Sequence, residues 1–297
     1  MTSSPPERRR TMVVLLIGLM VVALFLRLAY LFTLEIETPI RADARAYVMT
    51  AVNLSERGVY SSETEMPPRP TAFYTPGYPF FLLAVLKSSS SLSEFVRNTY
   101  FAQAVLSAVT VGLLFMLAVQ CMPVLMAAGA ALCVSLSPHL TVFAGYLLTE
   151  TLFIFALVAS LLWTAFVIRH PTKLRWLLVG VGFGVAALVR PAILLFPVAL
   201  LAVPLFMYAR KSALSAGAMV LIGLVAIWAP WSVWKQTTVP PAISAMAASL
   251  AFGSYPDMVH KSQEHRGYPY REDDQYAFMN KSASNAVSVI AERVAES

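Results

Sequence analysis

Long apolar runs alternate with short polar breaks along most of this chain. Such runs predict membrane-spanning helices, because about 20 apolar residues at about 1.5 Å each cross the roughly 30 Å of hydrocarbon in a bilayer. We therefore predict an all-α polytopic membrane protein. About seven spans are expected, at residues 12–34, 98–120, 123–146, 149–168, 174–189, 192–208 and 213–234.

Composition agrees with this class, since 58% of the residues are hydrophobic and only 13% are charged. A cleaved signal peptide is not expected, because the first apolar run continues past Arg27 to Leu34 without a small-residue cleavage pattern. Cys121 and Cys133 have no partners that would suggest a disulfide framework or a zinc site. The net charge of +6 lacks the basic and aromatic interleaving of a nucleic-acid surface, so no nucleic-acid partner is expected.

Basic residues orient the spans, because short cytoplasmic loops carry an excess of Lys and Arg. Residues 8–10 are all Arg, and further basic loops follow the fourth span at 169–175 and the sixth at 210–211. The predicted domains are a cytoplasmic N-terminus at 1–11, a membrane domain at 12–234 and an exoplasmic polar segment at 235–297. We expect the loop at 35–97 and the 190–191 junction to be exoplasmic too.

The first outside loop predicts short interfacial helices. Apolar and small residues recur at helical spacing from 41 onward, and Gly58 is a plausible stop for a surface helix. Pro76-Gly77 then predicts a turn. The apolar stretch 78–86 is too short to cross the membrane, so we expect it to lie in the interface or to re-enter.

Three polar residues fall at this same predicted rim: Asp43, Glu150 and Arg190. Glu150 is the only carboxylate between Glu94 and Asp257, and it opens an apolar run. Because a charge at the membrane is costly, such a residue suggests a functional site by default.

Each of these residues also has a structural interpretation. Arg190 would anchor at the lipid headgroups, with Pro191 starting the next helix. Glu150 would be favoured by the helix macrodipole and capped by Thr149. Arg27 either snorkels or pairs inside the bundle, or takes a direct part in the site.

Several short motifs resemble a known family. They are Asp43-Ala-Arg-Ala-Tyr47, Ala51-Val-Asn-Leu54, Gly58-Val-Tyr60, Thr75-Pro-Gly-Tyr-Pro79, Ser137-Pro138, Leu148-Thr-Glu150 and the stretch from Gly180 to Arg190-Pro191. In this order they resemble the membrane-embedded glycosyltransferases of the C type (GT-C), glycosyltransferase family 39. The similar branch contains protein O-mannosyltransferases and bacterial lipid-A and lipopolysaccharide sugar transferases. The resemblance covers roughly residues 12–210, and it implies a GT-C-like helical bundle.

The resemblance implies an inverting sugar transfer from a polyprenyl-phosphate donor to an exoplasmic or periplasmic protein, lipid or glycan acceptor, in the bacterial inner membrane. Asp43 matches the acidic residue of the first outside loop. Ala44 stands where the family often has a second acidic residue, so a divalent metal is left open rather than expected. Family members usually continue through further spans, so we expect this chain to be a fragment or a short variant.

The residues can support this chemistry. Asp43 is the candidate base for the acceptor hydroxyl, and flanking arginines favour its ionised form. Glu150 is the second candidate carboxylate, and Arg190 offers a bidentate donor set for the leaving phosphate. The predicted substrate-binding residues are Tyr47, Tyr74, Tyr78 and His139, for which membrane-belt or rim roles are the alternative.

A transporter or flippase of lipid-linked sugars is the alternative function. Transporters place polar groups and broken helices near the membrane midplane, often in repeated halves. This chain instead gathers its polarity at one rim, which favours an enzyme. A noncatalytic scaffold would leave the carboxylates and the arginine without an account.

Overall fold

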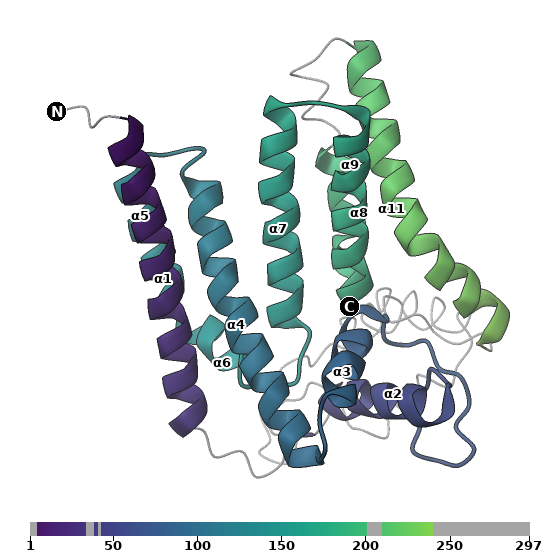
Figure 1. The fold of residues 1–297 in the computed structure, drawn as a ribbon. Helices are drawn as coiled ribbons and strands as arrows, with labels where there is room; N and C mark the ends of the chain where they lie inside the picture. Colours follow the sequence, from purple (N-terminus) through teal and green to yellow (C-terminus); the bar gives the residue numbers. More distant parts are fainter. Residues whose placement is uncertain (1–4, 34–38, 41–42, 201–209, 240–297) are drawn as a thin grey trace, which may run out of the picture. The chain divides into compact units, whose positions relative to one another are not determined.

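The computed structural model describes residues 5–33, 39–40, 43–200 and 210–239, and within these ranges it is helical with no strand. The predicted fold class, an all-α membrane protein, is therefore confirmed (Figure 1). Of the predicted exoplasmic segment 235–297, residues 240–297 lie outside the described residues. The helices are α1 (Pro5–Thr33), α2 (Asp43–Arg57), α3 (Gly77–Lys87), α4 (Leu92–Ala118), α5 (Val124–Ser135), α6 (Pro138–Phe143), α7 (Glu150–Arg169), α8 (Lys173–Val189), the 3-10 turn η1 (Pro191–Ile193), α9 (Phe196–Leu200) and α11 (Arg210–Thr238).

The chain forms two compact units. The first contains Met1–Arg69 and Thr75–Trp231, and it holds almost all of the described helices. The second contains Pro70–Tyr74 and Ser232–Ser297. The site described below lies entirely in the first unit.

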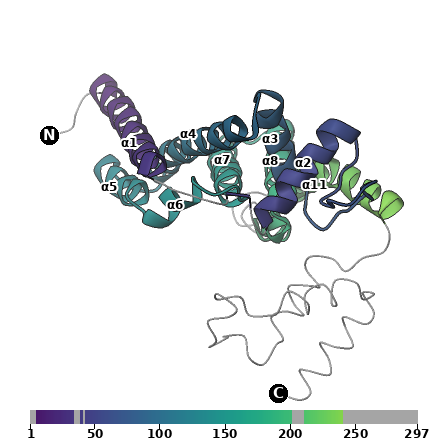
Figure 2. The same cartoon turned by 90° about the horizontal axis from the view of Figure 1, so that it is seen from below.

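Successive long helices of the first unit pack side by side. Helix α1 contacts α4, α4 contacts α7, and α7 contacts α8 (Figure 2). One apolar core joins α1, α4 and α5 around Phe115, and another joins α7, α8 and α11 around Phe183. Helices α8 and α11 approach closely at Gly180, because a glycine leaves room for the Val220 carbonyl oxygen where any Cβ would clash.

Four described helices are long and apolar enough to cross a membrane: Arg9–Thr33, Leu92–Ala118, Glu150–Arg169 and Lys211–Thr238. Helix α8 has 17 residues. At about 1.5 Å per residue it reaches about 25 Å, slightly less than the hydrocarbon thickness. The predicted count of seven spans stays a prediction, because part of the sixth, 201–209, lies outside the described residues.

The prediction of one continuous helix at 123–146 is wrong. The structure divides it into α5 and α6, with a break at Leu136 and Ser137. Pro138 is the physical reason, because proline disfavours a helical conformation in the preceding residue and cannot donate a backbone hydrogen bond. Pro138 instead begins the short helix α6.

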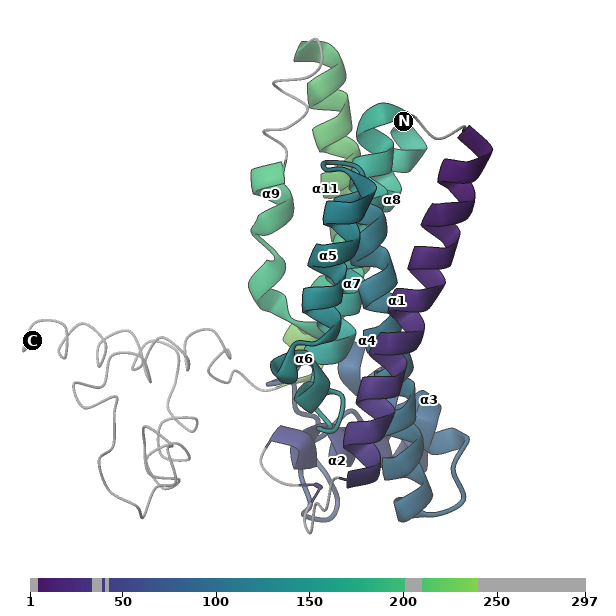
Figure 3. The same ribbon diagram turned by 90° about the vertical axis from the view of Figure 1, so that its left-hand side faces the viewer.

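Both helices expected in the first outside loop are present. Helix α2 ends at Arg57, and Gly58 follows with a positive φ of 67°, which glycine adopts without steric cost. Helix α3 covers 11 residues, too few to cross. Within the first unit, α2 and α3 lie at the end where α7 begins and α8 finishes (Figures 1 and 3).

Arg27 is held inside the helices rather than at their rim. Its side chain has no exposed surface. Its Nε donates to Ser107 Oγ at 2.9 Å, and its Nη1 donates to the carbonyl oxygens of Ser135 at 2.8 Å and Ala23 at 3.1 Å. Of the roles considered for Arg27, the structure shows bonding within the bundle, and complete burial excludes snorkelling.

Candidate active site

An ion pair joins two of the predicted site residues. Arg190 Nη2 lies 3.0 Å from Glu150 Oε1, although 40 residues separate them in the sequence. The Glu150 side chain is 20% exposed and that of Arg190 is 45% exposed. The pair therefore faces solvent on the arginine side, where a charged ligand could reach the guanidinium.

The end of α8 explains the position of Arg190. Because Pro191 follows, Arg190 adopts an extended conformation, with φ −140° and ψ 110°, and α8 stops at Val189. The Thr75-Pro-Gly turn packs against this end. Thr75 Oγ1 donates to the Val189 carbonyl at 3.3 Å, and a Cβ at Gly77 would lie 2.7 Å from the Leu188 carbonyl oxygen.

Tyr47 connects α2 to this ion pair. Its side chain is buried, and the charges of Glu150 and Arg190 act on its hydroxyl. Burial raises the pKa of Tyr47 far above its usual value, and the negative charges of Asp43 and Glu150 raise it further. The phenol therefore stays protonated and neutral across the physiological range.

The expected side-chain cap by Thr149 is wrong. Thr149 has helical angles, φ −71° and ψ −19°, and makes no capping hydrogen bond. A capping side chain needs an extended backbone to reach the first free N–H groups of the helix. Glu150 keeps its place in the first turn of α7.

Asp43 is exposed and opens α2, one helical turn before Tyr47. Residues at i and i+4 share a helix face, so α2 presents the carboxylate and the phenol together. The charges of Asp43, Glu150 and Arg190 all act on the Tyr47 hydroxyl. The structure thus brings these residues to one rim. Among the described residues, no group of three His, Cys, Asp or Glu side chains is arranged to hold a metal ion.

Tyr78 is a buried residue that packs against Tyr47. Its side chain has no exposed surface, and its ring packs edge-on against Tyr47 with 5.2 Å between centroids. Its hydroxyl donates to Gln103 Oε1 at 2.8 Å. The predicted direct binding of substrate by Tyr78 is at odds with this burial. Sequence reasoning missed Gln103, although it is the only amide side chain between Asn98 and Gln120.

The other two predicted binding residues make aromatic contacts of their own. His139 is exposed on α6 and packs edge-on against Phe143 of the same helix, with 4.5 Å between ring centroids. Tyr74 belongs to the second compact unit, where its ring packs against Phe73. Their roles in substrate binding stay predictions.

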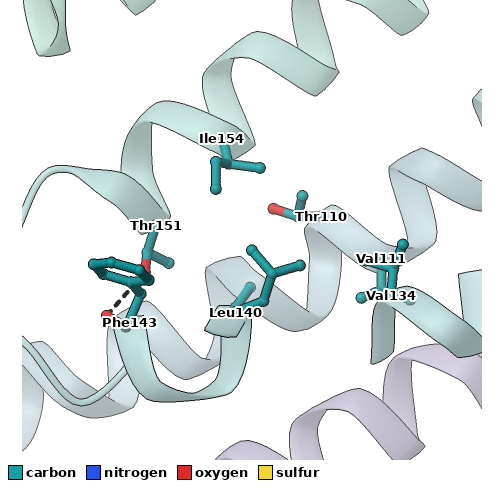
Figure 4. Close-up of a pocket in the computed structure, with 8 residues that line it drawn as sticks. Thr110, Val111, Val134, Leu140, Phe143, Thr151 and Ile154 are labelled. Carbon is teal, nitrogen blue, oxygen red and sulfur yellow. Dashed lines mark hydrogen bonds between the residues drawn. The ribbon is translucent and has the colours of Figure 1, made fainter. Parts of the chain in front are cut away.

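Glu150 lies at the boundary between this polar rim and an apolar interior. Its Oε2 is buried and has no hydrogen-bond partner among the described residues. The next residue, Thr151, lines a mainly apolar pocket with Leu140, Phe143 and Ile154 (Figure 4). Thr151 Oγ1 donates to the Phe143 carbonyl at 3.2 Å, so this wall is fixed.

A helical membrane protein with two carboxylates and an arginine at one rim has the features of an integral membrane enzyme. The family model described as dolichyl-phosphate-mannose-protein mannosyltransferase matches residues 75–234, more than half of the 297-residue chain, and the chain belongs to this family. It is therefore a membrane glycosyltransferase of the GT-C type. No curated protein gives a significant match to the chain. Glu150 and Arg190 lie inside the matched region, whereas Asp43 and Tyr47 precede it.

Proposed function

We propose that this protein transfers a sugar from a polyprenyl-phosphate donor to a protein, lipid or glycan acceptor, with inversion, on the exoplasmic or periplasmic side of the bacterial inner membrane. One observation carries the proposal: Glu150 and Arg190 form a 3.0 Å ion pair at the end of the helices where α2, which begins with Asp43, lies (Figure 1). Family membership supports sugar transfer in place of the transporter interpretation.

We assign each of these residues a separate role in the reaction. Asp43 takes the proton of the acceptor hydroxyl as its oxygen attacks the anomeric carbon, and the lipid phosphate leaves from the opposite face. Its exposure suits a base that meets an acceptor arriving from solvent. Arg190 compensates the charge of the departing phosphate with its planar donor set.

Glu150 and Tyr47 complete the site. Glu150 Oε1 holds the Arg190 guanidinium at 3.0 Å and so fixes its position at the rim, where the arginine is 45% exposed. The raised pKa of Tyr47 keeps the phenol protonated beside two carboxylates. We assign Tyr47 the task of holding α2 against Tyr78 of α3, next to the ion pair.

Substitution of Asp43 by Asn tests the proposal, because the amide keeps the size of the side chain but cannot take up a proton. General-base catalysis contributes about 10²–10⁴-fold, so transfer should fall at least about a hundredfold while expression and membrane insertion persist. The assay is transfer of radiolabelled sugar from a polyprenyl-phosphate donor into extracted acceptor by the full natural chain.

Two comparisons make this experiment specific. Glu56→Gln is the matched control, since Glu56 lies on the same helix, is exposed and pairs only with neighbouring Arg57 in the ion pairs of the described residues. Glu150→Gln tests the other carboxylate. A severe loss there with a mild loss at Asp43 would move the base to α7, and full activity in both variants would overturn the carboxylate mechanism.

A further inference from the structure

Gln103 stands out as a buried amide in the middle of a membrane-spanning helix. It lies on α4 with no exposed surface, and all of its hydrogen-bonding groups are engaged. Its Oε1 accepts from Tyr78, and its Nε2 donates to the carbonyl oxygens of Tyr146 at 2.7 Å and Ala144 at 3.1 Å. An amide is costly to bury, so an apolar residue would be the cheaper choice if packing alone mattered.

The partners of Gln103 lead directly to the candidate site. Ala144 and Tyr146 belong to the connection between α6 and α7, which turns sharply where Leu148 N–H donates to the Tyr146 carbonyl at 2.9 Å. Thr149 and Glu150 follow this turn at once. The start of α7, and so the Glu150 carboxylate, is thereby tied to α4.

The same amide also reaches α2 through aromatic packing. Tyr78, on α3, donates to Gln103 and packs edge-on against Tyr47. Gln103 on α4 is thus linked to α2 through Tyr78, while its two amide donors hold the connection before α7. A single side chain thus sets the separation between the element that carries Asp43 and the element that carries Glu150.

We propose that Gln103 is a positioning residue that aligns the two candidate carboxylates for sugar transfer by clamping the connection before α7 and the Tyr78–Tyr47 pair. This inference rests on the proposed function. Its physical basis is that a misplacement of about 1 Å at a reacting group can cost about a hundredfold in rate. The clamp acts on geometry, so it should affect turnover more than donor binding at the exposed Arg190.

Gln103→Met removes every hydrogen bond of the clamp and keeps most of the side-chain volume. We expect kcat for sugar transfer to fall about tenfold to a hundredfold with the donor KM changed less than about threefold. Tyr78→Phe should add little further loss of kcat in the Gln103→Met background, because both substitutions remove the hydrogen bond between Tyr78 and Gln103. Tyr78→Phe alone is the milder second variant, because it removes only the bond to Gln103 Oε1 and leaves both amide donors to the connection in place.

Ser107→Ala is the matched control. Ser107 lies one turn further along α4, and its side chain also bonds across helices, but to Arg27 on α1. This substitution should lower stability without changing kcat among molecules that remain folded. If Ser107→Ala lowers kcat as much as Gln103→Met does, the loss reflects general weakening of the bundle and the inference is overturned.

Labelling of a cysteine at position 147 measures the clamp without any assay of activity. Leu147 is buried at 1% exposure within the connection. In a background without the native cysteines, Leu147→Cys should react with maleimide at least about tenfold faster when Gln103 is Met, but not when Ser107 is Ala. Unchanged labelling and unchanged kcat in Gln103→Met would overturn the inference. If Gln103→Met speeds labelling but the parent protein with Gln103 intact transfers no sugar, the proposed function fails, and with it the role of the clamp in catalysis.

Discussion

Substitution of Arg190 by Ala distinguishes a role of this residue in donor binding from a role in protein stability. Arg190 pairs with Glu150 at 3.0 Å but is 45% exposed, so solvent screens the pair. An exposed ion pair contributes about 0.2–1 kcal/mol to stability, and Arg190→Ala should therefore leave the protein folded. A lost charged hydrogen bond to a ligand costs about 1.5–3 kcal/mol, or roughly a tenfold to hundredfold change in affinity.

We expect Arg190→Ala to weaken use of the polyprenyl-phosphate donor by about tenfold to a hundredfold. Arg190→Lys should fall between Ala and wild type despite its retained charge, because an ammonium cannot reproduce a bidentate contact with phosphate. The measurement is the initial rate of sugar transfer across a range of donor concentrations, with the thermal midpoint measured in the same detergent.

Arg175→Ala supplies the control for this experiment. Arg175 lies near the other end of α8, where it donates to the His170 carbonyl at 2.7 Å and sits over the Phe166 ring. Its removal should leave donor kinetics unchanged. Normal donor kinetics in folded Arg190→Ala would return Arg190 to the role of a headgroup anchor and refute its contact with the phosphate.

Two further predictions concern the fold and its orientation. Gly77→Ala should destabilise the protein by about 1–3 kcal/mol, because the new Cβ would meet the Leu188 backbone at 2.7 Å, whereas Gly129→Ala has open space and should be neutral or stabilising in thermal unfolding. Equal sensitivity at both positions would contradict the close contact of α3 with α8. Single cysteines at positions 43 and 172 should label from opposite sides of sealed membranes, and labelling from the same side would dismantle the proposed exoplasmic site.

The sequence by itself determined the class of the protein and many of its elements, because both depend on local patterns. Apolar runs of sufficient length predict helices in lipid, where every backbone polar group must be satisfied within the segment. Gly58 and the Arg190-Pro191 step end their helices through backbone sterics alone. The same local rule, applied to Pro138, would have predicted the break between α5 and α6.

Only the tertiary structure decided which side chains meet at the rim. Hydropathy and basic loops predict that Asp43, Glu150 and Arg190 share one side of the membrane, but they do not predict the 3.0 Å pair between the last two. That contact depends on how α7 packs against α8. The burial of Tyr78 and its bond to Gln103 likewise arise from packing between distant segments, which no local pattern encodes, because a helix periodicity does not specify its neighbour.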